Sequence, residues 1–224
     1  MRIGEVLKEE LAGLSASFMT GELAYLALTS KVEFPIRDRL AFRLHTRLGD
    51  GPSQVAREWH RTDLAVLSGG VPTLLLEVKA MYSFDAVDSA IGLDNFQRQV
   101  RRDRDKSLRP EASTAEVYAL LLVTHPGGPC GEELNAVVKY RTGIERGAKR
   151  GIERVREDAA AAVSKKFVDF RLITSTGSLD AGTAFGVPVG IDYYLFGPFP
   201  AGKPEESQDS TKERLAGANP TRPA

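Results

Sequence analysis

The chain has 224 residues, of which 42% are hydrophobic and 27% are charged. These proportions are those of an ordinary globular protein and exclude a mostly disordered or fibrous chain, and the length suits one domain with additions or two small domains. Thirty lysine and arginine residues balance thirty aspartate and glutamate residues, so any attraction to nucleic acid must come from local clusters of basic residues.

The first 125 residues predict, in chain order, helices, a group of strands, another helix and another strand. Apolar residues recur at helical spacing over residues 3–14, in two segments between residues 20 and 48 that join near 32–34, and over about 90–108. Extended apolar segments lie at residues 55–59, 61–67, 73–80 and 117–124. A Gly- and Pro-containing breaker at 68–72 joins the second and third of these segments into a β-hairpin.

The second half predicts one long helix followed by two strands. Residues 132–165 keep an apolar stripe, although Gly143, Gly147 and Gly151 recur in it and each costs about 1 kcal/mol relative to alanine. These glycines indicate either close packing or a broken helix, and we favour close packing. The predicted strands are 166–175 and 184–197. The segment 199–224, rich in Pro, Gly and charge, is expected to be a disordered tail after a folded domain at 1–198.

Cysteine content and the first residues bear on the cellular location. The single cysteine, Cys130, excludes an internal disulfide and is typical of a reducing compartment. Charged residues interrupt the first 20 positions, where a signal peptide needs an apolar stretch, and no run of 18 apolar residues follows. We therefore expect a cytoplasmic protein without a membrane span.

The hairpin carries the residues with the clearest chemistry. Asp63 opens its first strand, and Glu77 and Lys79 lie near the end of its second strand, on one face because side chains alternate along a strand. Adjacent carboxylates repel each other, and a divalent cation that prefers oxygen ligands, Mg²⁺ or Mn²⁺, relieves this repulsion. A bound metal activates water, and Lys79 can orient or deprotonate that water and stabilise the transition state, which predicts phosphodiester hydrolysis.

The order Thr62-Asp63, thirteen residues, Glu77-Val78-Lys79 resembles the PD-(D/E)XK nuclease superfamily, with Thr62 in place of the usual proline. The resemblance implies an α/β restriction-endonuclease-like fold with three layers, in which helices flank a mixed central sheet. It also implies a core that runs helix, three-stranded meander, helix, strand, and the elements predicted from about residue 20 to 125 follow that order.

The resemblance further implies an acidic residue on the first core helix that faces the metal. Glu33 is the first candidate for this position and Glu22 the second. The expected metal ligands are then Asp63, Glu77 and Glu33, with Lys79 as the remaining catalytic residue and Mg²⁺ as the cofactor. Gln99 resembles a glutamine that several subfamilies place near the active site, although Gln97 on the same predicted helix is an alternative.

Basic residues concentrate on the helix that follows the hairpin. The expected nucleic-acid-binding residues are Arg98, Arg101, Arg102, Arg104 and Lys106. A solvated helix face is the alternative interpretation, and we prefer that interpretation for a second basic stretch at 139–156. Just before Asp63, Trp59, His60 and Arg61 could stack on a base or contact a phosphate. We favour the alternative, in which Trp59 lies in the core and His60 is exposed.

These observations predict a Mg²⁺-dependent nuclease that acts on DNA. The alternative is a catalytically inactive protein of the same fold that binds nucleic acid or another protein. A third interpretation is an unrelated α/β domain in which Asp63 caps a turn, while Glu77 and Lys79 form an exposed pair on an edge strand. Endonuclease or exonuclease action, a homodimer and a partner subunit all stay open.

Overall fold

The structure is a computed structural model that describes residues 2–88, 90–106, 114–167 and 173–199. Its helices are α1 (Ile3–Ala12), α2 (Glu22–Thr29), α3 (Glu33–Leu48), α4 (Ser83–Asp88), α5 (Ala90–Lys106), α6 (Arg141–Arg150) and α7 (Ile152–Lys166). Short 3₁₀ turns lie at Leu14–Ser17 and Glu132–Leu134. Its strands are β1 (Ser53–Trp59), β2 (Thr62–Ser68), β3 (Val71–Tyr82), β4 (Glu116–Pro126), β5 (Ile173–Ala184) and β6 (Val187–Phe199).

All six strands form one mixed sheet in the order β1-β2-β3-β4-β6-β5. The first three strands are an antiparallel meander, β4 is parallel to β3, and β6 is antiparallel to both β4 and β5. The parallel step from β3 to β4 requires a crossover, which α4 and α5 provide. The predicted class, an α/β protein with a mixed sheet flanked by helices, is therefore confirmed.

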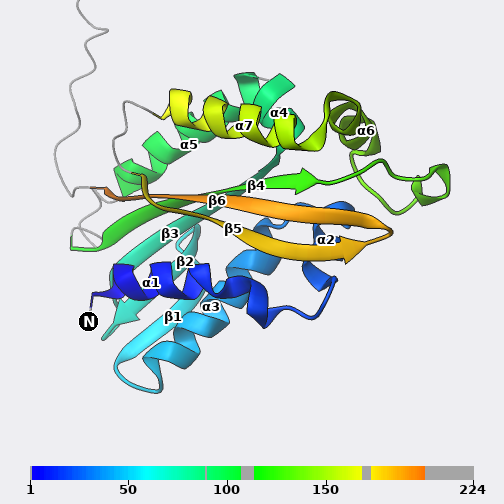
Figure 1. The fold of residues 1–224 in the computed structure, drawn as a ribbon. Coiled ribbons are helices and arrows are strands. Elements are labelled where there is room, and N and C mark those ends of the chain that lie inside the picture. The colour runs from blue at the N-terminus through cyan, green and yellow to red at the C-terminus, as the bar shows by residue number, and fades with distance from the viewer. Residues whose placement is uncertain (1, 89, 107–113, 168–172, 200–224) are drawn as a thin grey trace, which may run out of the picture.

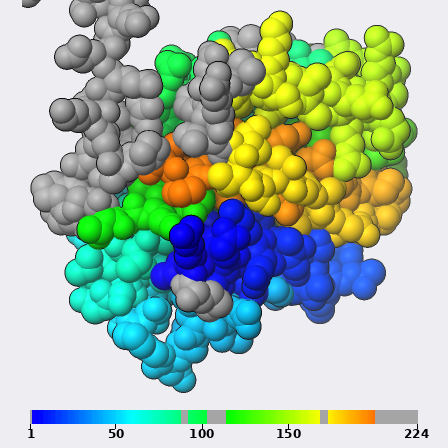
Figure 2. All heavy atoms as spheres, turned by 60° about the vertical axis from the view of Figure 1, so that its left-hand side comes forward, coloured from blue at the N-terminus to red at the C-terminus, as the bar shows by residue number. Residues whose placement is uncertain are grey.

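Helices cover both faces of the sheet (Figure 1). Helices α1, α2 and α3 lie on one face, whereas α5 and α7 lie on the other, and α4 and α6 pack against α7. Figure 2 shows α1, in blue, beside the yellow and orange strands β5 and β6. Leu7 of α1 and Ile191 of β6 belong to the same buried cluster, so the first helix and the last strand contribute to one core.

Strand alternation divides the core into two clusters. Along β3, Leu74, Leu76 and Val78 join the cluster beneath α1–α3, whereas Leu75 and Met81 join the cluster beneath α5 and α7. The sheet is therefore buried on both faces, which explains why its central strands are nearly continuous apolar runs. In the described residues, no helix combines the length and apolar character needed to span a membrane.

Two predicted elements are wrong in the second half. The predicted helix 132–165 is divided at Gly151, which has φ +91°, and residues 135–140 are not helical. The predicted strand 166–175 begins at Lys166, which is the last residue of α7, and its residues 168–172 lie outside the described residues. Strand β5 includes the end of the prediction and continues beyond it to Ala184. The mostly exposed strand β5 lacks a continuous apolar run, which misled the sequence analysis.

The end of the folded domain differs slightly from the prediction. Strand β6 extends through Phe199, one residue past the predicted boundary, and the Phe199 side chain is buried. The rest of the predicted tail, 200–224, lies outside the described residues.

Candidate active site

The candidate catalytic residues of β3 lie in the interior of the sheet. β3 is hydrogen-bonded to β2 on one side and β4 on the other. Glu77 and Lys79 alternate with Val78 and fall between Leu75 and Met81, so they share the face covered by α5. The Glu77 residue is only 6% exposed. The interpretation as an exposed pair on an edge strand is therefore wrong.

Asp63 lies next to these residues at the start of β2. Its Oδ2 atom accepts a hydrogen bond of 2.7 Å from the backbone N–H of Val78 and lies 3.4 Å from Lys79 Nζ. The antiparallel register that pairs Leu64 with Leu76 brings the start of β2 beside Glu77. Hairpin pairing thus produces the arrangement that the sequence spacing predicts.

Three carboxylates surround the Lys79 ammonium. Lys79 Nζ is 3.4 Å from Asp63 Oδ2, 3.6 Å from Glu33 Oε1 and 3.7 Å from Glu77 Oε2. Glu33 is the first residue of α3, so three separate elements contribute a carboxylate. Glu22, the second candidate for this position, instead pairs with Arg39 at 3.1 Å.

The surroundings of Lys79 determine its charge. Burial alone lowers the pKa of the Lys79 ammonium, but the charges of Asp63, Glu33 and Glu77 and the hydrogen bond to Asp63 raise it above its ordinary value. Lys79 is therefore a cation at neutral pH in this arrangement. A cationic lysine donates hydrogen bonds and stabilises negative charge, and it does not accept a proton from water.

A cavity of about 440 Å³ opens beside the ammonium. Its polar lining comes from α3, α4, α5, β3 and the segment that precedes α3: Lys31, Glu33, Lys79, Asp85, Asn95 and Gln99. Gln99 therefore lies where the sequence analysis expects it. Gln97 points elsewhere, because its Nε2 donates a 3.1 Å hydrogen bond to the carbonyl of Lys166.

Sequence reasoning did not identify Asp85 and Asn95 as parts of this cavity. Asp85 follows the end of β3 by three residues, and the polar residue that follows a buried parallel strand is a usual position for a ligand contact. The sequence therefore contained a signal for Asp85, namely an acidic residue shortly after a buried strand. Asn95 is on the first half of α5, and its side chain also accepts a hydrogen bond from Arg98.

The carboxylates have the chemistry of a Mg²⁺ site without its geometry. Among the residues described, no three His, Cys, Asp or Glu side chains form a group that could hold a metal ion. Asp63, Glu77 and Glu33 lie around an ammonium instead. The donors are all carboxylate oxygens, and three carboxylates against one lysine leave an excess of negative charge, which suits a hard divalent cation.

The predicted nucleic-acid-binding residues are only partly described. Arg98, Arg101 and Arg102 are exposed on α5, the helix that also carries Gln99. Arg104 and Lys106 belong to the same helix, but their side chains lie outside the described residues. The exposed arginines and the cavity thus share one helix.

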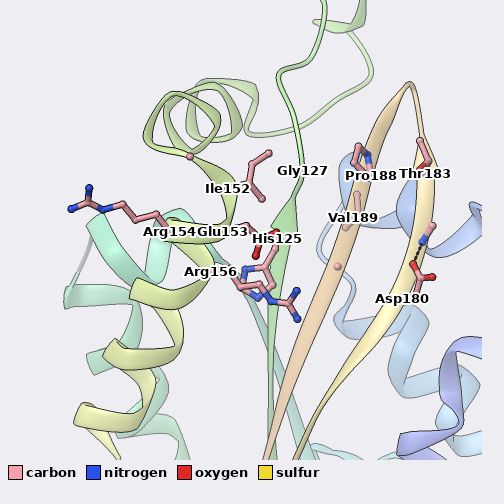
Figure 3. A pocket seen from close by; sticks show the side chains of 13 residues that line it. His125, Gly127, Ile152, Glu153, Arg154, Arg156, Asp180, Thr183, Pro188 and Val189 are labelled. Carbon is pink, nitrogen blue, oxygen red and sulfur yellow. Dashed lines mark hydrogen bonds between the residues drawn. The ribbon is translucent and has the colours of Figure 1, made fainter.

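A larger cavity, of about 760 Å³, lies elsewhere, between the start of α7, the end of β4 and the β5–β6 hairpin (Figure 3). Arg156 Nε and Nη2 donate hydrogen bonds of 3.0 and 2.6 Å to the two oxygens of Asp192, and Nη2 also bonds Ser178 Oγ at 3.0 Å. His125 Nε2 lies 3.1 Å from Asp192 Oδ2 but is poorly aligned for a hydrogen bond. Sequence analysis missed this cluster, although His125 and Asp192 each interrupt an apolar strand.

This larger cavity offers little for catalysis. Burial raises the pKa of the Asp192 carboxyl, but His125 and Arg156 more than reverse that effect and hold the pKa well below its ordinary value. Asp192 in turn neutralises Arg156, and Figure 3 shows Arg154 pointing away from the cavity. On the opposite wall, the Asp180 carboxylate is bound by the backbone N–H of Gly182 at 2.9 Å. The cluster therefore joins α7 to the three strands β4, β5 and β6.

The chain was compared with protein-family models, curated proteins and solved structures, and none of them matches. A functional assignment therefore rests on the residues and geometry of this chain.

Proposed function

We propose that the protein is a metal-dependent nuclease with a restriction-endonuclease-like fold, and that it hydrolyses phosphodiester bonds in DNA. The observation that carries the proposal is the convergence of Asp63, Glu77 and Glu33 on Lys79 Nζ, beside a polar cavity. Clustering three carboxylates in a partly buried site is unfavourable for folding alone, and such clusters are typical of functional sites.

The arrangement of elements supports the same proposal. Helix α3, the meander β1–β3, helices α4 and α5, and strand β4 follow one another, which agrees with the helix, meander, helix, strand order that the PD-(D/E)XK resemblance implies. The candidate residues come from three elements of this series: Glu33 from α3, Asp63 from β2, and Glu77 with Lys79 from β3.

Each residue has a role that follows from its chemistry. Asp63, Glu77 and Glu33 would hold Mg²⁺, which supplies an activated water and neutralises charge on a phosphoryl oxygen. Lys79, as a cation, would donate hydrogen bonds that orient the water and stabilise the charge that develops on the phosphate. Gln99 would offer an amide donor or acceptor at the cavity wall.

Binding of DNA would use the basic surface of α5. The exposed side chains of Arg98, Arg101 and Arg102 would contact backbone phosphates without reading sequence. This contribution is electrostatic, and DNA affinity is therefore expected to fall as salt concentration rises.

The proposal predicts metal-dependent cleavage that requires Lys79. Supercoiled plasmid, linear duplex and single-stranded DNA would be incubated with Mg²⁺ or Mn²⁺ and the wild-type protein, Lys79→Ala or Lys8→Ala. Lys8 is the matched control, because it lies on α1 and pairs only with Glu5 in the described contacts. We expect cleavage by wild type and Lys8→Ala, and a loss of at least about 100-fold for Lys79→Ala.

Metal binding is measured separately by thermal unfolding. Mg²⁺ or Mn²⁺ should raise the Tm of the wild-type protein, and Asp63→Asn should abolish the increase. Cleavage that survives Lys79→Ala would place the active site elsewhere. Absence of both cleavage and metal stabilisation would make the cluster a structural ion-pair network, as in a catalytically inactive binding protein of the same fold.

A further inference from the structure

The turn between β1 and β2 has a backbone conformation that its residues disfavour. His60 and Arg61 form this two-residue turn between the paired residues Trp59 and Thr62, and their φ angles are +48° and +69°. Glu58, just before the turn, has φ +56°. Two-residue turns with positive φ at both central positions usually contain Asn-Gly or Gly-Gly, because glycine adopts positive φ without a steric cost.

The next hairpin also has a two-residue turn with positive φ at both positions, and there the residues are glycines. Gly69 and Gly70 connect β2 to β3 between the paired residues Ser68 and Val71, and their φ angles are +57° and +81°. One meander thus contains two turns of one class, the first built from histidine and arginine and the second from glycine. The requirements of the turn explain the glycines but do not explain His60 and Arg61.

The two turns lie at opposite ends of β2 with respect to the candidate site. Arg61 precedes Asp63 by two residues, whereas the Gly69–Gly70 turn follows the far end of the strand, about 20 Å away at 3.3 Å per residue. Strained conformations of non-glycine residues persist near functional sites more often than elsewhere. In this meander the unfavourable residues lie in the turn next to the carboxylates.

Contacts hold the strained turn in a defined position. The Glu58 carboxylate accepts a 2.9 Å hydrogen bond from Arg37 of α3, the helix that also carries Glu33. The Trp59 and His60 rings meet edge to face, with centroids 4.4 Å apart, and Trp59 packs against the cluster beneath α5 and α7. The Trp59 side chain is partly buried, and the His60 and Arg61 side chains are exposed.

We propose that the His60–Arg61 turn contacts the phosphate backbone of the nucleic acid bound at the Lys79 site. Arg61 donates charge-assisted hydrogen bonds to a phosphate, and His60 supplies a second donor from a fixed ring. Asn-Gly would relieve the backbone strain but would remove both contacts. This inference rests on the proposed nuclease function, and it adds a substrate-binding element that lies outside the carboxylate cluster and α5.

The test is the double variant His60→Asn/Arg61→Gly, which installs the residues that the turn prefers. Its Tm should rise by about 2–8 °C, because the strain of two residues is relieved. Its affinity for a fluorescent DNA oligonucleotide without divalent cations should fall several-fold. Between about 50 and 200 mM salt, the slope of log affinity against log salt should decrease by about one, as expected when the Arg61 charge no longer contacts a phosphate.

Two further variants separate the causes. Gly69→Asn places Asn-Gly in the other hairpin, so it should leave DNA affinity unchanged. Arg61→Lys keeps the positive charge and should retain most of the salt slope.

A higher Tm with unchanged DNA affinity in the double variant overturns the proposal. A lower Tm also overturns it, because the two side chains would then serve the stability of the turn. If the wild-type protein neither binds nor cleaves DNA, the proposed nuclease function is overturned as well. If the wild-type protein cleaves DNA and the double variant binds DNA as tightly as wild type, only the proposed role of the turn is overturned.

Discussion

At the scale of single residues, the neighbours of a carboxylate decide whether it can stay ionised inside the protein. Asp192 keeps its charge because Arg156 binds both of its oxygens and His125 lies 3.1 Å away. Lys79 shows the converse, since three carboxylates keep it charged despite burial. Alternation along β3 was enough to predict that Glu77 and Lys79 share a face. No local pattern joins residues 125, 156 and 192, because they meet only when β6 pairs with β4 and α7 packs on the sheet.

The depressed pKa of Asp192 predicts a pH dependence of stability. Because the pKa is lower in the folded protein than in the unfolded chain, ionised Asp192 stabilises the fold fully above its unfolded pKa of about 4. This contribution is lost as the pH falls from that value toward the folded pKa. At pH 7, Asp192→Asn should lower the free energy of unfolding by about 1–3 kcal/mol, because Arg156 loses a partly buried ionic partner and solvent screens the pair in part.

Urea unfolding of wild type and Asp192→Asn at several pH values measures this difference directly. The difference between the two proteins should be constant above about pH 5 and should shrink below about pH 4. Comparing the two proteins at each pH removes the contribution of the carboxylates they share. An equally large difference at pH 3 would contradict the assigned role of the Asp192 charge.

At the scale of elements, three glycines that recur in one apolar stripe have different structural surroundings. Gly151 ends α6 and precedes α7, with φ +91°. Gly143 lies against Phe84, so a Cβ atom at this position would be 2.5 Å from the Phe84 ring. A Cβ at Gly147 would have no neighbour within 4 Å. The sequence therefore predicted that glycine mattered in this stretch, but it could not assign one glycine to packing and another to a chain break, because both depend on tertiary contacts.

This difference predicts opposite effects of the same substitution one helical turn apart. Gly143→Ala should lower the free energy of unfolding by about 1–3 kcal/mol, because the methyl group overlaps a buried phenyl ring. Gly147→Ala should raise it by about 0.5–1 kcal/mol, because alanine favours the helix and meets no obstacle. Chemical denaturation of both variants tests the pair, and each serves as the control for the other. Equal effects would mean that α6 does not pack on Phe84 in this way.

At the scale of the whole molecule, a single six-stranded sheet carries both buried clusters of the described residues. The two buried clusters lie on opposite faces of the same six strands. If one cluster unfolds, it exposes strands whose other face packs the second cluster, so the two clusters depend on each other. The sequence predicted the order helix, meander, helix, strand, because these elements have strong apolar periods and clear turn residues. It did not predict that β5 extends to Ala184, since that strand has few buried residues and depends on pairing with β6.

The shared sheet predicts that the described chain unfolds as one cooperative unit. Trp59, the only tryptophan, packs against the cluster beneath α5 and α7, so its fluorescence reports on that face of the sheet. Leu7 is fully buried in the cluster on the opposite face. Leu7→Ala should lower the free energy of unfolding by about 2–5 kcal/mol. If the two faces form a single domain, the Trp59 fluorescence transition in urea should shift by the same amount as the far-UV circular dichroism transition. A fluorescence midpoint that stays in place while the circular dichroism midpoint moves would show that the two faces unfold separately, and the prediction of one domain would then be wrong.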